Sequence, residues 1–173
     1  MFGFFKRKVT KPLIELTLHN LTEGATMEYD LKTWVVDAVY EYIWENNFKS
    51  REYKFIDGIT YFFLEVDEEG TILMSKPAKL KHIAPDFKQE IQNLKTVPEN
   101  LVYKNEIYKL SEESFGSYRK IGNENWSELT SWMYWNTKDE FICIEQWSKF
   151  EFEGHLGGKI NPFSIDNLLP GNK

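Results

Sequence analysis

Two glutamates lie in runs of aromatic residues, and they are the groups in this sequence best placed to do chemistry. Glu65 follows Tyr61 and Phe63 at alternate positions, and Glu145 precedes Trp147 with the same spacing. In a strand, alternate side chains share a face, so each carboxyl group is expected beside aromatic rings. Poor hydration there would raise its pKa. The pair could act as two acids or as polar anchors in a groove; alternatively, each glutamate lies at a sheet edge or accepts a hydrogen bond from a Trp or Tyr.

A second pair, Trp126 and Glu128, shows the same alternate spacing one predicted strand earlier. If the two strands form a hairpin, the four side chains could converge on one face. Indole rings and carboxylates suit a partner that carries Lys or Arg, or a small cation such as a polyamine, through cation–π and ion-pair contacts. The alternative is that the tryptophans belong to the core. The candidate binding residues are Trp126, Glu128, Glu145, Trp147 and Glu65.

No motif in the sequence assigns a reaction, a metal or a cofactor. His19, His82 and His155 are too far apart to form a local metal motif, and there is no phosphate-binding loop or nucleophile elbow. Cys143, the single cysteine, lies in an apolar run and is expected to be a buried structural thiol. We therefore assign no catalytic residue, no metal ligand and no cofactor, and the sequence favours binding over catalysis.

Three functions compete at this stage. The first is an accessory or protein-interaction module, because the chain has many predicted strands and no catalytic set. The second is a binding protein for a small ligand, either a cation or a carbohydrate. The third is a hydrolase that uses Glu65 and Glu145 as paired carboxylates. A carbohydrate would stack on exposed indole rings, and the candidates for that role are Trp126, Trp132, Trp135 and Trp147.

The overall composition narrows the class of protein and its partners. The chain has 173 residues, a net charge of −6 and 16% aromatic residues. An acidic chain without a basic stripe is not expected to bind nucleic acid. No apolar run approaches the roughly 18–20 residues of a membrane span, so we expect a cytoplasmic protein. The N-terminal segment, residues 1–12, is expected to be flexible; alternatively, its Phe and Lys residues make peripheral contact with an anionic membrane.

The order of elements predicts a mainly β protein. Short alternating runs are bounded by turns, and Asp57-Gly58 predicts a type I′ hairpin. Apolar residues recur at helical spacing between residues 83 and 94, which predicts one amphipathic helix over residues 85–95. The whole chain is expected to form one compact unit. Its expected parts are a first β half (13–75), a bridging segment with the helix (76–100), a second β half (101–160) and a loose tail (161–173).

The two β halves share a sequence pattern. The pattern Tyr29-x4-Trp34-x-Val36 corresponds to Tyr103-x4-Tyr108-x-Leu110. Later in each half, Tyr53 and Phe55 align with Met133 and Trp135, and Leu64-Glu65 aligns with Ile144-Glu145. Common order and spacing predict two similar small antiparallel sheets or barrels, related by a pseudo-two-fold axis and bridged by the helix.

A diffuse pattern of aromatic residues, Gly and Glu over about residues 13–165 resembles the bacterial family called domain of unknown function 4178. The resemblance implies no activity and no catalytic residue, because the family has none established. Members tend to be encoded near membrane-stress, polyamine-related and small membrane proteins, which implies an accessory role. The pattern is carried by Leu18-x2-Leu21-x2-Gly24, Met27-Glu28-Tyr29, Trp34-Val35-Val36, Glu41-Tyr42-x-Trp44, Tyr61-Phe62-Phe63-Leu64-Glu65, Val102-Tyr103-x2-Glu106-x-Tyr108-x-Leu110, Trp126-x-Glu128, Ile144-Glu145-x-Trp147 and Phe152-Glu153-Gly154.

Overall fold

The structure, a computed structural model, describes residues 16–171 and confirms the mainly β class. Strands account for 57% of the residues, and helices are few and short. None of the helices within residues 16–171 is long and apolar enough to cross a membrane. The strands are β1 (Thr26–Tyr29), β2 (Lys32–Trp44), β3 (Lys49–Asp57), β4 (Thr60–Asp67), β5 (Ile72–Ala78), β6 (Asn100–Tyr103), β7 (Glu106–Lys120), β8 (Ser127–Trp135), β9 (Glu140–Gln146), β10 (Phe152–Lys159) and β11 (Ile165–Leu169).

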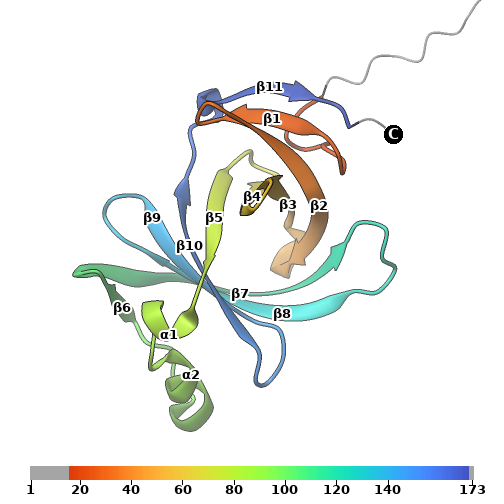
Figure 1. The fold of residues 1–173 in the computed structure, drawn as a ribbon. Helices are drawn as coiled ribbons and strands as arrows, with labels where there is room; N and C mark the ends of the chain where they lie inside the picture. The colour runs from red at the N-terminus through yellow and green to blue at the C-terminus, as the bar shows by residue number, and fades with distance from the viewer. Residues whose placement is uncertain (1–15, 172–173) are drawn as a thin grey trace, which may run out of the picture.

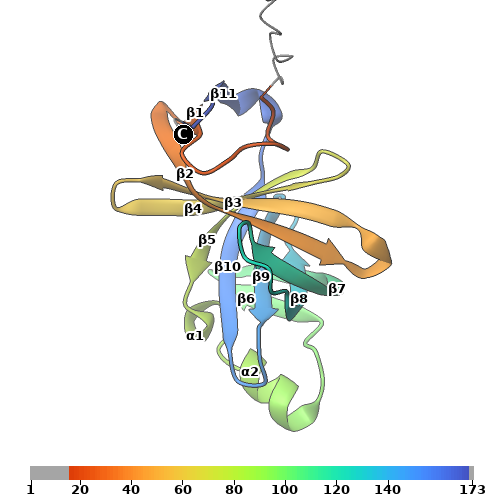
Figure 2. The ribbon, with the colours of Figure 1, turned by 90° about the vertical axis from the view of Figure 1, so that its right-hand side faces the viewer.

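Eight of the strands close into an antiparallel barrel (Figures 1 and 2). The strands β2 to β5 form one meander and β7 to β10 form another. The meanders join where β5 pairs with β10 and where β2 pairs with β7, and we call these two pairings the seams. We call the interior of the closed barrel the lumen. The strands β1 and β11 extend the first half, and β6 extends the second.

Each half has its own hydrophobic core, and both cores lie on the sheet faces that point away from the lumen. In the first core, Tyr53 and Phe55 of β3 pack with Phe62 and Leu64 of β4. Because side chains alternate along a strand, the residues between them face the lumen. The second core is built in the same way on β8 and β9, with helical residues added from the bridging segment.

The bridging helix forms close to its predicted position. A short helix α1 (Leu80–Ile83) precedes α2 (Phe87–Gln89), which continues into the π-helical turn η2 (Glu90–Leu94). Phe87 is buried and Ile91 packs against the second core, but Leu94 is exposed. The π turn bonds residues five apart, so the predicted apolar face is out of phase by its end. Two further turns are 3-10 helices, η1 (Glu45–Asn47) and η3 (Pro162–Ser164).

Two local expectations need correction. The C-terminal segment, expected as a loose tail over residues 161–173, instead contains η3 and the strand β11, which pairs with β1. In the β3–β4 hairpin, Asp57 pairs with Thr60, so the loop residues are Gly58 and Ile59. Of these two only Gly58 has a positive φ, the pattern of a type II′ turn. The segment 1–12 lies outside the described residues.

The two meanders have several features in common. Each is preceded by a short strand and a two-residue turn in which both φ angles are positive, at Asp30-Leu31 and at Lys104-Asn105. The long first strand of each, β2 or β7, has a bulge near its start. Leu64 lies opposite Tyr53, and Ile144 lies opposite Trp132. If Leu64 is matched with Ile144, the residue that corresponds to Tyr53 is therefore Trp132, one position from the Met133 of the sequence alignment.

Gly157 on β10 provides a test of the β5–β10 seam. A Cβ at this position would lie 2.2 Å from the carbonyl oxygen of Met74 and 2.4 Å from the ring of Phe141. The carbonyl belongs to β5, so relief of the clash requires the seam to shift. We predict that Gly157→Ala lowers the unfolding free energy by about 3 kcal/mol, the upper part of the range for overpacking, as measured by urea denaturation. Gly158→Ala, whose nearest contact would be 3.1 Å, is the control and should cost clearly less. Equal stability of both variants with the parent would contradict this account of the seam.

Candidate functional site

Three glutamates meet in the lumen because of the strand register. Glu52 on β3 lies directly opposite Glu65 on β4. Glu145 projects into the same space from β9, with Ser131 of β8 as its cross-strand partner. All three line one small cavity of about 20 Å³, which is large enough for one water molecule or ion. The structure therefore brings Glu65 and Glu145 together in the lumen.

Two of these carboxyl groups accept hydrogen bonds from neighbouring lumen side chains. The Tyr42 hydroxyl donates to Glu52 Oε1 at 3.1 Å, and the Ser50 hydroxyl donates to Glu65 Oε1 at 2.5 Å. The indole N–H of Trp44 donates to Ser50 Oγ at 2.9 Å. These bonds orient Glu52 and Glu65 but place no positive charge beside them.

Burial raises the pKa of each of the three glutamates, and repulsion within the cluster adds to the shift at Glu52 and Glu145. For Glu52 the largest cause is burial, followed by the charge of Glu65, and the pKa rises to about 8. Burial also raises the pKa of Glu65, and burial with repulsion from Glu52 and Glu65 raises that of Glu145 well above its usual value. The three carboxyl groups therefore favour their protonated forms more than exposed glutamates do, and a cation that binds there must displace any proton that they hold.

His155 completes the lumen cluster on the β10 side. Its ring is 8% exposed, and its Nε2 lies 3.9 Å from a carboxylate oxygen of Glu145 and 3.9 Å from one of Glu153. Burial lowers the pKa of His155 to about 4, so the ring is neutral near pH 7. Phe63 contacts the ring edge-to-face, with 5.7 Å between the centroids.

Cys143, which lies opposite His155, is buried as expected. Its Sγ lies 3.3 Å from the Ser131 hydroxyl. Burial raises the pKa of its thiol well above the usual value, so the reactive thiolate is disfavoured.

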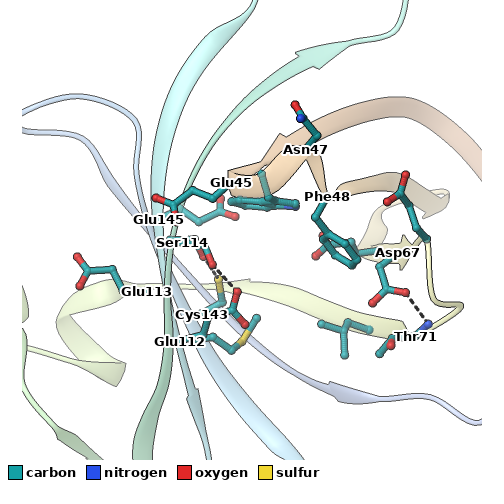
Figure 3. Close-up of a pocket in the computed structure, with 16 residues that line it drawn as sticks. Glu45, Asn47, Phe48, Asp67, Thr71, Glu112, Glu113, Ser114, Cys143 and Glu145 are labelled. Atoms are coloured by element: carbon teal, nitrogen blue, oxygen red, sulfur yellow. Dashed lines mark hydrogen bonds between the residues drawn. The ribbon is translucent and has the colours of Figure 1, made fainter.

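One end of the lumen opens into a cleft of about 600 Å³, which we call the acidic cleft (Figure 3). Figure 3 shows that acidic side chains from separate elements surround it, including Glu45 from η1, Glu112 from β7 and Glu145 from β9. Among the described residues that line it there is no Lys, Arg or His. The acidic residues that line the cleft are Glu45, Glu65, Asp67, Glu68, Glu112, Glu113 and Glu145.

The other end opens into a cleft of about 530 Å³, which we call the aromatic cleft. Glu52, Glu145 and His155 form part of its lining, so the small cavity separates it from the acidic cleft. The exposed Glu153 and Glu151 add acidic groups at its rim. Its aromatic lining comprises Tyr40, Tyr42, Phe63, Tyr118, Trp147, Phe150 and Phe152.

The sequence-predicted binding residues do not all converge. Glu65 and Glu145 meet in the lumen, and Trp147 lines the aromatic cleft, with its ring 4.3 Å from that of Tyr118. The predicted β8–β9 hairpin forms, but its register pairs Ser131 with Glu145. Glu128 lies three residues from Ser131, so it projects from the opposite face of the sheet. Trp132, one of the proposed stacking platforms, is buried in the second core.

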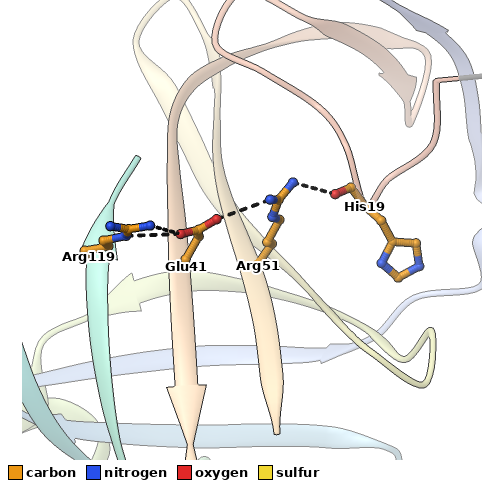
Figure 4. A network of polar contacts seen from close by, with 4 residues as sticks. All are labelled: His19, Glu41, Arg51 and Arg119. Atoms are coloured by element: carbon orange, nitrogen blue, oxygen red, sulfur yellow. Dashed lines mark hydrogen bonds and ion pairs between the residues drawn. The ribbon is translucent and has the colours of Figure 1, made fainter. Parts of the chain in front are cut away.

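Trp126 lies beside a separate polar network on the outer face of the β2–β7 seam. Figure 4 shows the members of this network that are linked by hydrogen bonds and ion pairs: His19, Glu41, Arg51 and Arg119. Glu41 on β2 lies between two arginines, and both make ion pairs with it: Arg119 of β7 at 3.0 Å and Arg51 of β3 at 3.2 Å. Arg51 also donates to the carbonyl of His19 at 2.7 Å. The Arg119 guanidinium lies over the Trp126 ring at 4.7 Å, so this indole already has a cationic partner. The network ties the seam together and lies outside both clefts.

Sequence reasoning missed Glu52, Glu153 and His155. The sequence did contain a signal for Glu52, because a two-residue hairpin loop at Gly58 places Glu52 on the same face of the sheet as Glu65. The other two had none, since β10 takes its place beside β5 only through a pairing between residues about 80 positions apart in the chain.

Comparison with known proteins agrees with the resemblance noted above. The sequence model of the family described as Domain of unknown function (DUF4178) matches residues 22–162. The chain belongs to this family. An uncharacterized protein of Aquifex aeolicus (strain VF5) is 26% identical to this DUF4178 chain over 172 residues, covering 98% of it and 94% of the relative. No solved structure matches.

The buried glutamates give this DUF4178 protein a predictable pH dependence. Glu52 has a raised pKa in the folded state, so folding is favoured while it stays protonated and is disfavoured as pH rises through about 8. His155 has a lowered pKa in the folded state, so its contribution makes folding more favourable as pH rises, but only up to about pH 6.5. We predict that Tm falls between pH 6.5 and 8.5 and that Glu52→Gln flattens this decrease. Glu128→Gln, an exposed control, should leave it unchanged; an identical slope in all three proteins would refute the assignment.

Proposed function

We propose that this chain is a binding protein for a small organic polycation and that the ligand lies in the acidic cleft. The observation that carries the proposal is the lining of that cleft, with seven acidic residues and no basic residue among those described. Its volume of about 600 Å³ lies in the range of small-molecule sites. The proposal refines the reading of the chain as a binding module and gives a reason to favour a cation over a carbohydrate.

The arrangement of the cleft suits a chain with several ammonium groups separated by methylene groups. Exposed Glu45 and Glu112 provide carboxylates at the rim, while Glu65 and Glu145 lie at the inner end. Between them the lining includes apolar side chains, those of Trp44, Phe48, Leu73 and Met133. Carboxylates would bind the ammonium groups, and the apolar side chains would contact the methylene groups.

Protonation of the inner glutamates gives the site a built-in response to its ligand. Without a cation, burial raises the pKa of both Glu65 and Glu145 and so favours their protonated forms. An ammonium group at the inner end would favour their ionised forms, so binding would release protons. Affinity for the ligand would then rise with pH across the neutral range.

The proposal is tested with spermidine as the probe, by isothermal titration calorimetry at low salt. We predict one spermidine per chain, weakened at least tenfold in the double variant Glu45→Gln/Glu112→Gln, and proton release that appears as a buffer-dependent heat. The control Glu99→Gln/Glu124→Gln removes the same charge from exposed positions outside the clefts and should change affinity less than twofold. Equal weakening in both double variants would indicate only a general charge effect, and the proposal would then be wrong, as it would be if no heat were observed.

We also propose that the two β halves arose by duplication, as the sequence repeat suggests. The shared turns, bulges and strand order support this relation, and so does the pairing of corresponding strands at both seams. The prediction is that residues 26–75 superpose on residues 101–153 with Glu65 matched to Glu145. If the best superposition displaces one glutamate from the other, the duplication proposal fails.

A further inference from the structure

We infer that Glu145, Glu153 and His155 form a binding site for a divalent transition-metal ion, at the inner end of the aromatic cleft. One ligand atom from each of these residues lies within 4.8 Å of the other two. This site differs from the polycation site proposed above in two of its ligands, because Glu153 and His155 line the aromatic cleft and not the acidic one, while Glu145 borders both clefts.

The strand pairing brings these three side chains together. Glu145 of β9 and Glu153 of β10 are direct cross-strand partners, and His155 lies two residues further along β10 on the same face. Two carboxylates placed directly opposite each other repel, and a cation between them would remove this repulsion. The lumen face of this strand pair therefore presents two oxygen ligands and one nitrogen ligand to a common point.

His155 is the observation that distinguishes this cluster from an ordinary group of acidic residues. Only 8% of its surface is exposed, so the residue is 92% buried. Neither of its ring nitrogens has a hydrogen-bond partner within residues 16–171. A buried polar group without a partner is costly, and native proteins rarely leave one. Its Nε2 points toward the two carboxylates without bonding to either, at 3.9 Å from each. A metal ion between them would provide a partner for Nε2 of the imidazole and for both carboxylates together.

The two separations between the imidazole and the carboxylates fit a metal ion with small adjustments. Two ligands held at about 2.0–2.1 Å in a tetrahedral site lie about 3.4 Å apart. The observed 3.9 Å distances therefore require a closure of roughly half an ångström. The Glu153 side chain is 64% exposed and is free to make that adjustment.

The ligand types also select the class of metal. An imidazole with two carboxylates suits Zn²⁺ and similar first-row ions, whereas Mg²⁺ and Ca²⁺ prefer oxygen ligands alone. The buried Glu52 borders the same small cavity and is available to bind a metal-bound water molecule or to act as a further ligand.

Zinc binding by the metal-free, untagged chain tests the inference. We expect one Zn²⁺ per chain by calorimetry, with a higher Tm when zinc is bound. In NMR spectra the ring signals of His155 should shift on zinc addition, while those of the exposed His19 and His82 should not. Stoichiometric binding with shifts only at His19 or His82, or no binding at micromolar zinc, would overturn the inference.

Variants separate this site from other acidic surfaces. His155→Gln and Glu153→Gln should each weaken zinc binding at least tenfold. Glu153 is exposed, so its variant should remain folded even if the buried His155 substitution does not. Glu151→Gln, at the rim of the same cleft, is the matched control and should change affinity less than twofold. Unchanged zinc affinity in Glu153→Gln would contradict the inference.

The same variants distinguish this inference from the proposed function. Glu45→Gln/Glu112→Gln should weaken spermidine binding but leave zinc binding intact, and Glu153→Gln should do the reverse. Zinc binding without spermidine binding would remove only the proposed function. Spermidine binding without zinc binding would remove only the metal site.

Discussion

Every strand of the barrel has two faces, and its apolar face is turned away from the lumen. This constraint determines the rest of the structure. The apolar outer face of each meander must be covered. In the first half, β1, β11 and the residues before β1 cover it, and in the second half β6 and the bridging helix do so. The faces that remain for the interior carry Glu, Ser, Tyr and His side chains among apolar ones such as Leu73, Met133 and Phe141. The interior is thus more polar than that of the usual small barrel, in which apolar side chains fill the centre.

The separation of the apolar cores from the lumen explains how the chain tolerates three carboxyl groups close together. Three carboxyl groups near one another without a basic neighbour would destabilise an ordinary core. Here they border open clefts and favour their protonated forms, and two of them accept hydrogen bonds from Tyr42 and Ser50. Stability comes instead from the two outer cores and from the seams. The ion pairs of Glu41 with Arg51 and Arg119 reinforce one seam, on the face of the sheet opposite to the site.

Much of the fold could be predicted from the sequence because alternation and turn residues are local signals. They identified the β class, the helix and the residues that share a strand face with Glu65 and with Glu145. What they could not supply was register between strands distant in sequence. A displacement of one residue transfers a side chain to the other face, which is why Glu128 lies apart from Glu145 and why Tyr53 was aligned with the wrong partner. His155 gains its role only after β10 pairs with β5, and no local pattern reports that pairing.

The separation of the two cores from the lumen has a consequence for how such a protein can evolve. Substitutions at the inner faces of β3, β4, β9 and β10 alter the chemistry of the clefts while the contacts of both cores remain as they are. Substitutions that favour a new ligand would then change the stability of the fold little. Relatives that keep the aromatic framework can therefore diverge in what they bind, so that a common fold would be inherited without a common ligand.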